Sequence, residues 1–128
     1  MEINKRILLI EDDNNEATLL TSYIMNRQQK IDVKRVSDLA GAHEASKRTS
    51  FDLVLLDLNL PDGFGPNSID ELKRLGVKSP VIVITSMLAQ LTAQVSLDKG
   101  AISAFSKRQL YDGAADHIIF DDFAVDIS

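Results

Sequence analysis

Five polar side chains follow short apolar runs in this sequence, at the points where strands are expected to end. Glu11 and Asp12 follow one run, Asp57 and Thr85 stand at the ends of two others, and Lys107 ends a weaker one. Three carboxylates brought together repel one another and raise one another's pKa values unless a cation lies between them. Mg²⁺ prefers oxygen ligands of this kind. The residue types therefore predict an acidic site that binds a divalent cation.

Each of these residues taken alone also has a structural explanation. The acidic pair could cap a helix, Asp57 could begin a turn with Asn59, and a Thr or Lys at a strand end is commonly solvated surface. These separate explanations do not account for a polar group at the end of successive strands. Ligands of open α/β sheets bind outside the carboxyl ends of the strands. The pattern therefore favours one shared crevice.

The strands that would position this crevice are indicated by aliphatic runs. Residues 7–10, 53–56 and 81–84 are uninterrupted apolar runs of four, which is typical of strands buried on both faces of a parallel sheet. Weaker strands are expected at 33–36 and 101–105. Because right-handed helical crossovers connect parallel strands, five such strands predict a (βα)5 fold.

Helical patterns separate the predicted strands. Asp13 and Glu16 have capping-box spacing ahead of the first helix, the third helix is expected to stop at Gly76, and the fourth at Gly100. The second covers about 38–48 and the fifth about 109–123. The expected apolar faces, in chain order, are Ala17, Leu20 and Ile24; Leu39, Ala42 and Ala45; Ile69, Leu72 and Leu75; Leu88, Leu91 and Val95; Leu110, Ala114 and Ile118.

Composition narrows the class of protein. A chain of 128 residues is expected to form one α/β domain. The net charge of −5 is the wrong sign for a surface that tracks phosphates, so no direct nucleic-acid ligand is expected. The absence of Cys excludes disulfides, thiolate zinc sites and Cys nucleophiles. Apolar runs of four are too short for a membrane helix or a signal peptide, so a soluble cytoplasmic protein without a membrane partner is expected.

Four motifs together resemble the receiver domain of two-component response regulators, of the chemotaxis-regulator type. They are ILLIEDD (7–13), LVLLDLNLPDG (53–63), PVIVITS (80–86) and KGAISAFSK (99–107). The resemblance extends over about 6–115, with 116–128 as the end of the last helix and a tail, so that 1–128 is expected to be a single receiver domain. It implies a flavodoxin-like, doubly wound parallel sheet in the order 2-1-3-4-5.

The resemblance implies that Asp57 accepts a phosphoryl group. The donor would be the phosphohistidine of a sensor histidine kinase or of a histidine phosphotransfer protein. The resemblance also implies Mg²⁺ as the cofactor, with Asp12, Asp57 and the backbone carbonyl of Asn59 as direct ligands, and Glu11 holding a metal-bound water.

Other roles follow from the same resemblance. Lys107 and the Thr85 hydroxyl would bind phosphoryl oxygens, and Asn59 and Met87 would flank the path of the hydrolytic water and tune the lifetime of the phosphate. The chain would catalyse only its own phosphorylation and slow autodephosphorylation, so it is not expected to be an enzyme. Phosphorylation would switch the binding of a downstream protein, and a dimer through the face of helix four, strand five and helix five is possible.

Two positions depart from the family pattern. Arg108 stands where the family usually has Pro, and since a non-proline cis bond costs about 2.5–4 kcal/mol, the peptide after Lys107 is expected to be trans. Thr85 and Ala104 are the switch positions of the family pattern. Ala104 stands where the family usually has Tyr or Phe. Phe105 follows it and is expected on the opposite face of the strand. With a methyl group at position 104, no aromatic ring is expected to couple to Thr85 from that position.

Parts of the pattern also suit two other functions. Ala104 and Arg108 also suit a phosphorylation-independent, protein-binding module that keeps the fold without the switch. A phosphatase resembling the haloacid dehalogenases would need a second carboxylate two residues after its nucleophile, and Asn59 stands there. The tail, in which Phe123, Val125 and Ile127 alternate with other residues, could either pack on the domain or dock a partner as a strand.

Overall fold

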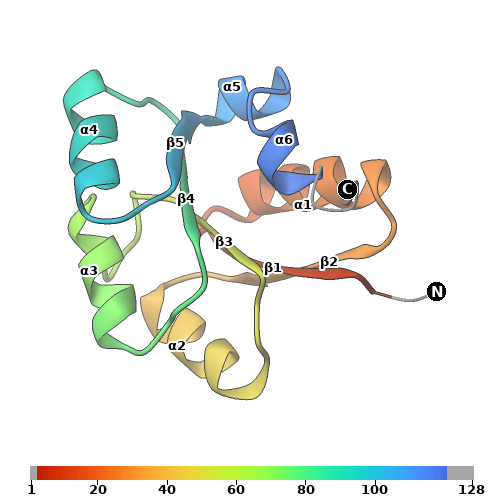
Figure 1. The fold of residues 1–128 in the computed structure, drawn as a ribbon, viewed down its shortest axis with the longest axis horizontal. Coiled ribbons are helices and arrows are strands. Elements are labelled where there is room, and N and C mark those ends of the chain that lie inside the picture. Colours follow the sequence, from red (N-terminus) through yellow and green to blue (C-terminus); the bar gives the residue numbers. More distant parts are fainter. Residues whose placement is uncertain (1–2, 121–128) are drawn as a thin grey trace, which may run out of the picture.

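The computed structural model describes residues 3–120, whose five strands form one parallel sheet in the order β2-β1-β3-β4-β5 (Figure 1). The predicted fold class, strand order and alternation of strands with helices are confirmed. The strands are β1 (Lys5–Ile10), β2 (Ile31–Val36), β3 (Leu53–Leu56), β4 (Val81–Thr85) and β5 (Ser103–Ser106). The helices are α1 (Asn14–Arg27), α2 (Leu39–Arg48), α3 (Asn67–Arg74), α4 (Gln90–Asp98), α5 (Lys107–Tyr111) and α6 (Asp116–Ile119).

Helices cover both faces of the sheet, which is why its central strands are apolar throughout. Residues of β1, β3 and β4 alternate between two buried clusters, one beneath α2 and α3 and the other beneath α1, α5 and α6 (Figure 1). Every residue of β3 and of β4 is buried. The parallel register aligns the carboxyl ends of β1, β3 and β4 at one edge of the sheet, because Ile10 pairs with Leu56 and Leu56 pairs with Val83.

The predicted single helix over 109–123 is wrong as far as residue 120, where the described residues end, because two short helices form there instead. Gly113 lies between them with a φ of +96°, a conformation that L side chains rarely adopt. The amide of Ala114 donates to the carbonyl of Gln109, and that of Gly113 donates to Leu110, each at 3.0 Å. This pattern ends α5. Ala115 and Ile119 are therefore buried, whereas the predicted Ala114 is exposed.

The break at Gly113 leads to a stability prediction. Gly113→Ala should lower the free energy of unfolding by about 1–2 kcal/mol, because alanine resists the positive φ. The added Cβ would also lie 3.2 Å from an oxygen of Asp116. Urea denaturation monitored by circular dichroism would measure the change. Asp112→Ala is the control, since Asp112 is exposed and helical (φ −80°), and an equal loss in both variants would contradict this account.

The boundary between the last strand and α5 also differs from the prediction. Strand β5 spans Ser103–Ser106 rather than 101–105, and Lys107 begins α5 instead of ending the strand. The reason is a capping box, in which the Ser106 side chain accepts from the Gln109 amide and the Gln109 side chain accepts from the Ser106 amide. Lys107 still points back to the same edge of the sheet.

The predicted apolar face of the fourth helix is wrong as well. Leu91 is 74% exposed, Leu88 and Val95 are half-buried, and the buried residue of α4 is Ser96. Helix α4 packs mainly beside β5, at the border of the sheet (Figure 1), so it buries a narrow strip. Ser96 is tolerated there because its hydroxyl donates to the carbonyl of Thr92 at 2.8 Å.

Two expectations concern the tail and membranes. The tail residues Phe123, Val125 and Ile127 lie outside the described residues. Within residues 3–120, none of the helices has the length and the hydropathy that a membrane span requires.

Candidate functional site

The structure brings the acidic pair after β1 and the aspartate after β3 together at one edge of the sheet. Carboxylate oxygens of Glu11, Asp12 and Asp57 lie within 4.8 Å of one another. Backbone hydrogen bonds that continue the sheet set this geometry, since the Asp57 amide donates to the Ile10 carbonyl at 3.0 Å. Glu11 and Asp57 are buried, whereas Asp12 is exposed. The arrangement joins two buried carboxylates to one that faces solvent.

Lys107 supplies the positive charge of this cluster. Its Nζ lies 2.7 Å from Glu11 Oε1, 3.2 Å from Asp57 Oδ2 and 3.7 Å from Glu16 Oε1. The lysine is itself buried. The predicted contact with the acidic residues is therefore present although Arg108 follows in place of Pro. The described chain contains no cis peptide bond, so the prediction of a trans bond after Lys107 is confirmed.

Asp57 is held on both carboxylate oxygens. Its Oδ1 accepts from the Asn59 amide at 3.0 Å and from the Thr85 hydroxyl at 3.3 Å, and its Oδ2 faces Lys107. Thr85, the last residue of β4, is buried. Thr85 and Lys107, the two side chains predicted to bind phosphoryl oxygens, therefore both contact the predicted phosphoacceptor, Asp57.

The remaining predicted residues lie at the rim or behind the site. Asn59 is exposed beside Asp57, and Met87 is 88% exposed in the loop after β4. Ala104 is half-buried against the cluster beneath α2 and α3, while Phe105 packs on the opposite face. The alternation predicted for strand five is confirmed, so the ring of Phe105 does not lie on the face of Ala104, which pairs with Val83 of β4.

Burial and like charge control the protonation of Glu11. Desolvation raises the pKa of its carboxyl from the ordinary value of 4.5 to about 7; the neighbouring Asp57 adds to the rise, and Lys107 and the Asp13 amide oppose it. Burial lowers the pKa of Lys107, but Glu11 and Asp57 raise it by more, so its net shift is upward. The lysine is therefore charged at neutral pH, while Glu11 is near its midpoint of titration.

The raised pKa of Glu11 predicts how stability depends on pH in the absence of divalent cations. The folded state holds this proton more tightly than the unfolded state, so the contribution is complete below about pH 4.5 and is lost as pH rises through about 7. The free energy of unfolding should fall by up to about 3 kcal/mol from this group. Urea denaturation between about pH 5 and 8 would measure it. Glu11→Gln should abolish this part of the slope, and an identical slope in the variant would refute the assignment.

The donor set at this edge fits a hard divalent cation. It offers three carboxylates from Glu11, Asp12 and Asp57, and oxygen is the ligand atom that Mg²⁺ prefers. Asp12 is the exposed member, so the set is open to solvent on one side. The residues present therefore agree with the cofactor that the resemblance implies.

Three residues around the site were not predicted from sequence. Glu16 lies near Lys107, Asp62 accepts the amides of Leu39 and Ala40 at 3.0 and 3.2 Å, and Arg35 binds the loop after β1. Asp62 lies inside the LNLPDG loop, and α2 begins at Leu39. A carboxylate that caps a helix 23 residues earlier leaves no local spacing pattern. For Arg35, the sequence offered one signal, which is a cationic residue on the edge strand next to the strand that carries the acidic pair.

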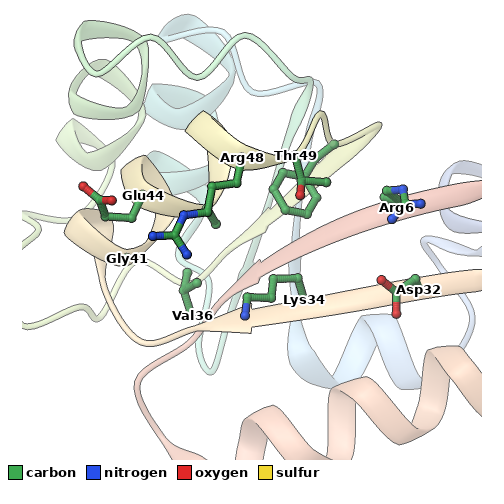
Figure 2. Close-up of a pocket in the computed structure, with 10 residues that line it drawn as sticks. Arg6, Asp32, Lys34, Val36, Gly41, Glu44, Arg48 and Thr49 are labelled. Atoms are coloured by element: carbon green, nitrogen blue, oxygen red, sulfur yellow. The ribbon is translucent and has the colours of Figure 1, made fainter.

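A cavity of about 430 Å³ lies elsewhere, between β2 and α2. Figure 2 shows Arg48 from α2 and Lys34 and Val36 from β2 facing the same space. The lining shares no residue with the carboxylate cluster. The cavity is therefore a separate surface and not part of the candidate site.

Comparison with known sequences gives a family match and curated relatives. The family model described as the response regulator receiver domain matches residues 7–114. The chain is 30% identical over 105 residues to the response regulator protein PilR of Pseudomonas aeruginosa, covering 82% of this chain and 23% of that protein. It is 34% identical over 101 residues to the DNA-binding response regulator MtrA of Mycolicibacterium smegmatis, covering 77% and 42%. The chain thus spans less than half the length of these relatives.

Solved structures share the fold. A two-component response regulator from Clostridium difficile superimposes with a TM-score of 0.76 at 18% identity, over 95% of this chain and 100% of that one. The beryllofluoride-activated NtrC4 receiver domain dimer gives a TM-score of 0.74 at 26% identity, over 94% and 100%. At 18% identity, the first match shows a similar fold alone. At 26% identity, the second match shows similarity in sequence as well.

Proposed function

This chain belongs to the response regulator receiver domain family, and we propose that its Asp57 accepts a phosphoryl group from a phosphohistidine. The donor would be a sensor histidine kinase or a histidine phosphotransfer protein in the cytoplasm. The observation that carries this proposal is the contact of Asp57 with both Lys107 and Thr85 beside two further carboxylates. Phosphorylation would then switch the binding of a downstream protein.

In the transfer, one carboxylate oxygen of Asp57 attacks the phosphorus of the phosphohistidine. The new O–P bond forms as the P–N bond breaks, and the imidazole nitrogen keeps the bonding pair. Lys107 and the Thr85 hydroxyl, which now bind the carboxylate at 3.2 and 3.3 Å, would turn to the incoming phosphoryl oxygens. Positioning and charge neutralisation supply most of the catalysis in such transfers.

Mg²⁺ would be held by Asp12, Asp57 and the backbone carbonyl of Asn59, with Glu11 acting through a water. When bound, the ion offsets the negative charge of the carboxylates and of the phosphoryl group. The chain would catalyse only this modification of itself and its slow hydrolysis. Asn59 and Met87, at the exposed rim, would set the rate of that hydrolysis.

The switch would differ from that of receivers with an aromatic residue in strand five. Ala104 presents only a methyl group behind Thr85, so the response is proposed to pass through the loop after β4 and through α4. Leu91, Leu97 and Ile102 are exposed on α4 and before β5. We propose this face as a docking surface or dimer interface, and the NtrC4 receiver domain is an example of a similar domain that forms a dimer.

Labelling with acetyl phosphate tests the proposal without a partner kinase. The protein with Mg²⁺ should gain one phosphate, seen by intact mass spectrometry, and the gain should disappear with excess chelator. Ala104 is the observation that favours the second candidate, a phosphorylation-independent binding module. No incorporation at any Mg²⁺ concentration would refute the phosphoacceptor function and favour that module.

A further inference from the structure

Arg35, on the edge strand β2, binds the loop that carries the acidic pair. Its Nε donates to the backbone carbonyl of Glu11 at 2.8 Å, and its Nη1 donates to the side-chain Oδ1 of Asn14 at 2.9 Å. The side chain is half-buried. The first residue of this loop is also bonded to β2, because the Glu11 amide donates to the Val36 carbonyl at 3.0 Å. Both backbone polar groups of Glu11 are therefore held by this one strand.

These contacts bracket Asp12 in the sequence. Arg35 holds the carbonyl of Glu11 immediately before Asp12 and the side chain of Asn14 two residues after it. The Asp12 carboxylate is exposed and, among residues 3–120, makes no hydrogen bond or ion pair of its own. Its place within 4.8 Å of the other two carboxylates is therefore set by the backbone on either side of it.

We propose that Arg35 is a positioning residue for the cation site, acting on Asp12 through the backbone that flanks it. This inference rests on the proposed function, which makes Asp12 a direct ligand of Mg²⁺. The guanidinium is a fixed positive charge and by itself opposes a cation. Its benefit must therefore come from geometry, because the planar fork donates to two acceptors at once and a lysine ammonium lacks that fork.

This contrast defines the test. Arg35→Lys keeps the charge but cannot keep both hydrogen bonds, to the Glu11 carbonyl and to Asn14. The Mg²⁺ affinity, measured by calorimetric titration with MgCl₂, should therefore fall about tenfold, as is typical when an outer partner of a metal ligand is lost. Asn14→Ala removes only the second acceptor and should lower the affinity less. Arg27→Lys is the matched control, since Arg27 also donates to two acceptors, Tyr23 and Asp116, at the opposite end of α1. Its Mg²⁺ affinity should equal that of the wild type.

A second measurement needs no metal. Amide hydrogen exchange at Glu11 and Asp13, whose amides donate to the Val36 carbonyl and to Glu11 Oε2, should be faster in metal-free Arg35→Lys than in the wild type and in Arg27→Lys. Unchanged exchange in Arg35→Lys, or an Mg²⁺ affinity equal to that of Arg27→Lys, would overturn the inference. Failure of the wild type to bind Mg²⁺ would instead overturn the metal assignment in the proposed function, and the exchange rates would still decide whether Arg35 fixes the loop.

Discussion

Asp57→Asn is expected to abolish the incorporation of phosphate from acetyl phosphate. An amide oxygen is not the nucleophile that a carboxylate is, so no acyl phosphate can form at that position. The fold should survive, because the amide can still accept from the Asn59 amide and from the Thr85 hydroxyl, which now hold Oδ1 at 3.0 and 3.3 Å. Phosphate-affinity electrophoresis with Mg²⁺ would show one shifted band for the wild type and none for the variant.

The matched control is Asp52, the residue that immediately precedes β3. Asp52 is exposed and accepts from the Arg6 amide at 2.8 Å, so it shares residue type and neighbourhood in sequence but lies at the opposite end of β3. Asp52→Asn should be labelled as fully as the wild type. A shifted band of equal intensity in Asp57→Asn would mean that the acceptor is a different residue.

Lys107→Ala is expected to have the largest effect on stability. The substitution leaves Glu11 and Asp57 buried without the cation that now lies 2.7 and 3.2 Å from them. Breaking a buried ion pair by removing one partner costs about 3–5 kcal/mol. The loss should be greater at pH 8 than at pH 6. The Glu11 pKa is about 7 with Lys107 in place and rises further without it, so Glu11 is protonated at pH 6 in both proteins and the repulsion is relieved there. Urea denaturation at both values of pH would measure it.

An exposed ion pair in the same fold serves as the control for Lys107. Lys99 lies 2.6 Å from Asp70, which is largely exposed, and exposed pairs contribute about 0–1 kcal/mol. Lys99→Ala should therefore change the free energy of unfolding little and without a difference between the two values of pH. A Glu11→Gln substitution added to Lys107→Ala should restore part of the lost stability. If the two lysine variants lost equal stability, the buried cluster would not depend on Lys107.

The central sheet and the carboxylate cluster could be predicted because their signals are local. Runs of four aliphatic residues predict strands buried on both faces, and the polar residue that ends each run must emerge at the carboxyl edge of a parallel sheet. The contact of Lys107 with Asp57 therefore followed from strand order together with the family resemblance. The trans peptide after Lys107 followed from the cost of a non-proline cis bond.

The parts that could not be predicted depend on competition between local signals or on distant partners. Gly113 ends α5 although apolar residues continue on both sides of it, because its amide and the next one close the helix. Leu91 continues the apolar spacing of α4, but no element within residues 3–120 covers it. Arg35 and Asp62 act on backbone groups that lie 24 and 23 residues away in the chain, and no spacing rule connects a side chain with such acceptors.

The most direct test of the account is to locate the phosphate by chemical trapping. Borohydride reduces an aspartyl phosphate to homoserine and leaves free carboxylates unchanged, so fragmentation of the tryptic peptides after labelling with acetyl phosphate and Mg²⁺ identifies the acceptor. The account predicts homoserine at Asp57 and unmodified Asp12, Asp52 and Asp62. Homoserine at another position, or its absence throughout a protein that has been shown to bind Mg²⁺, would contradict the assignment of Asp57 as the phosphoacceptor.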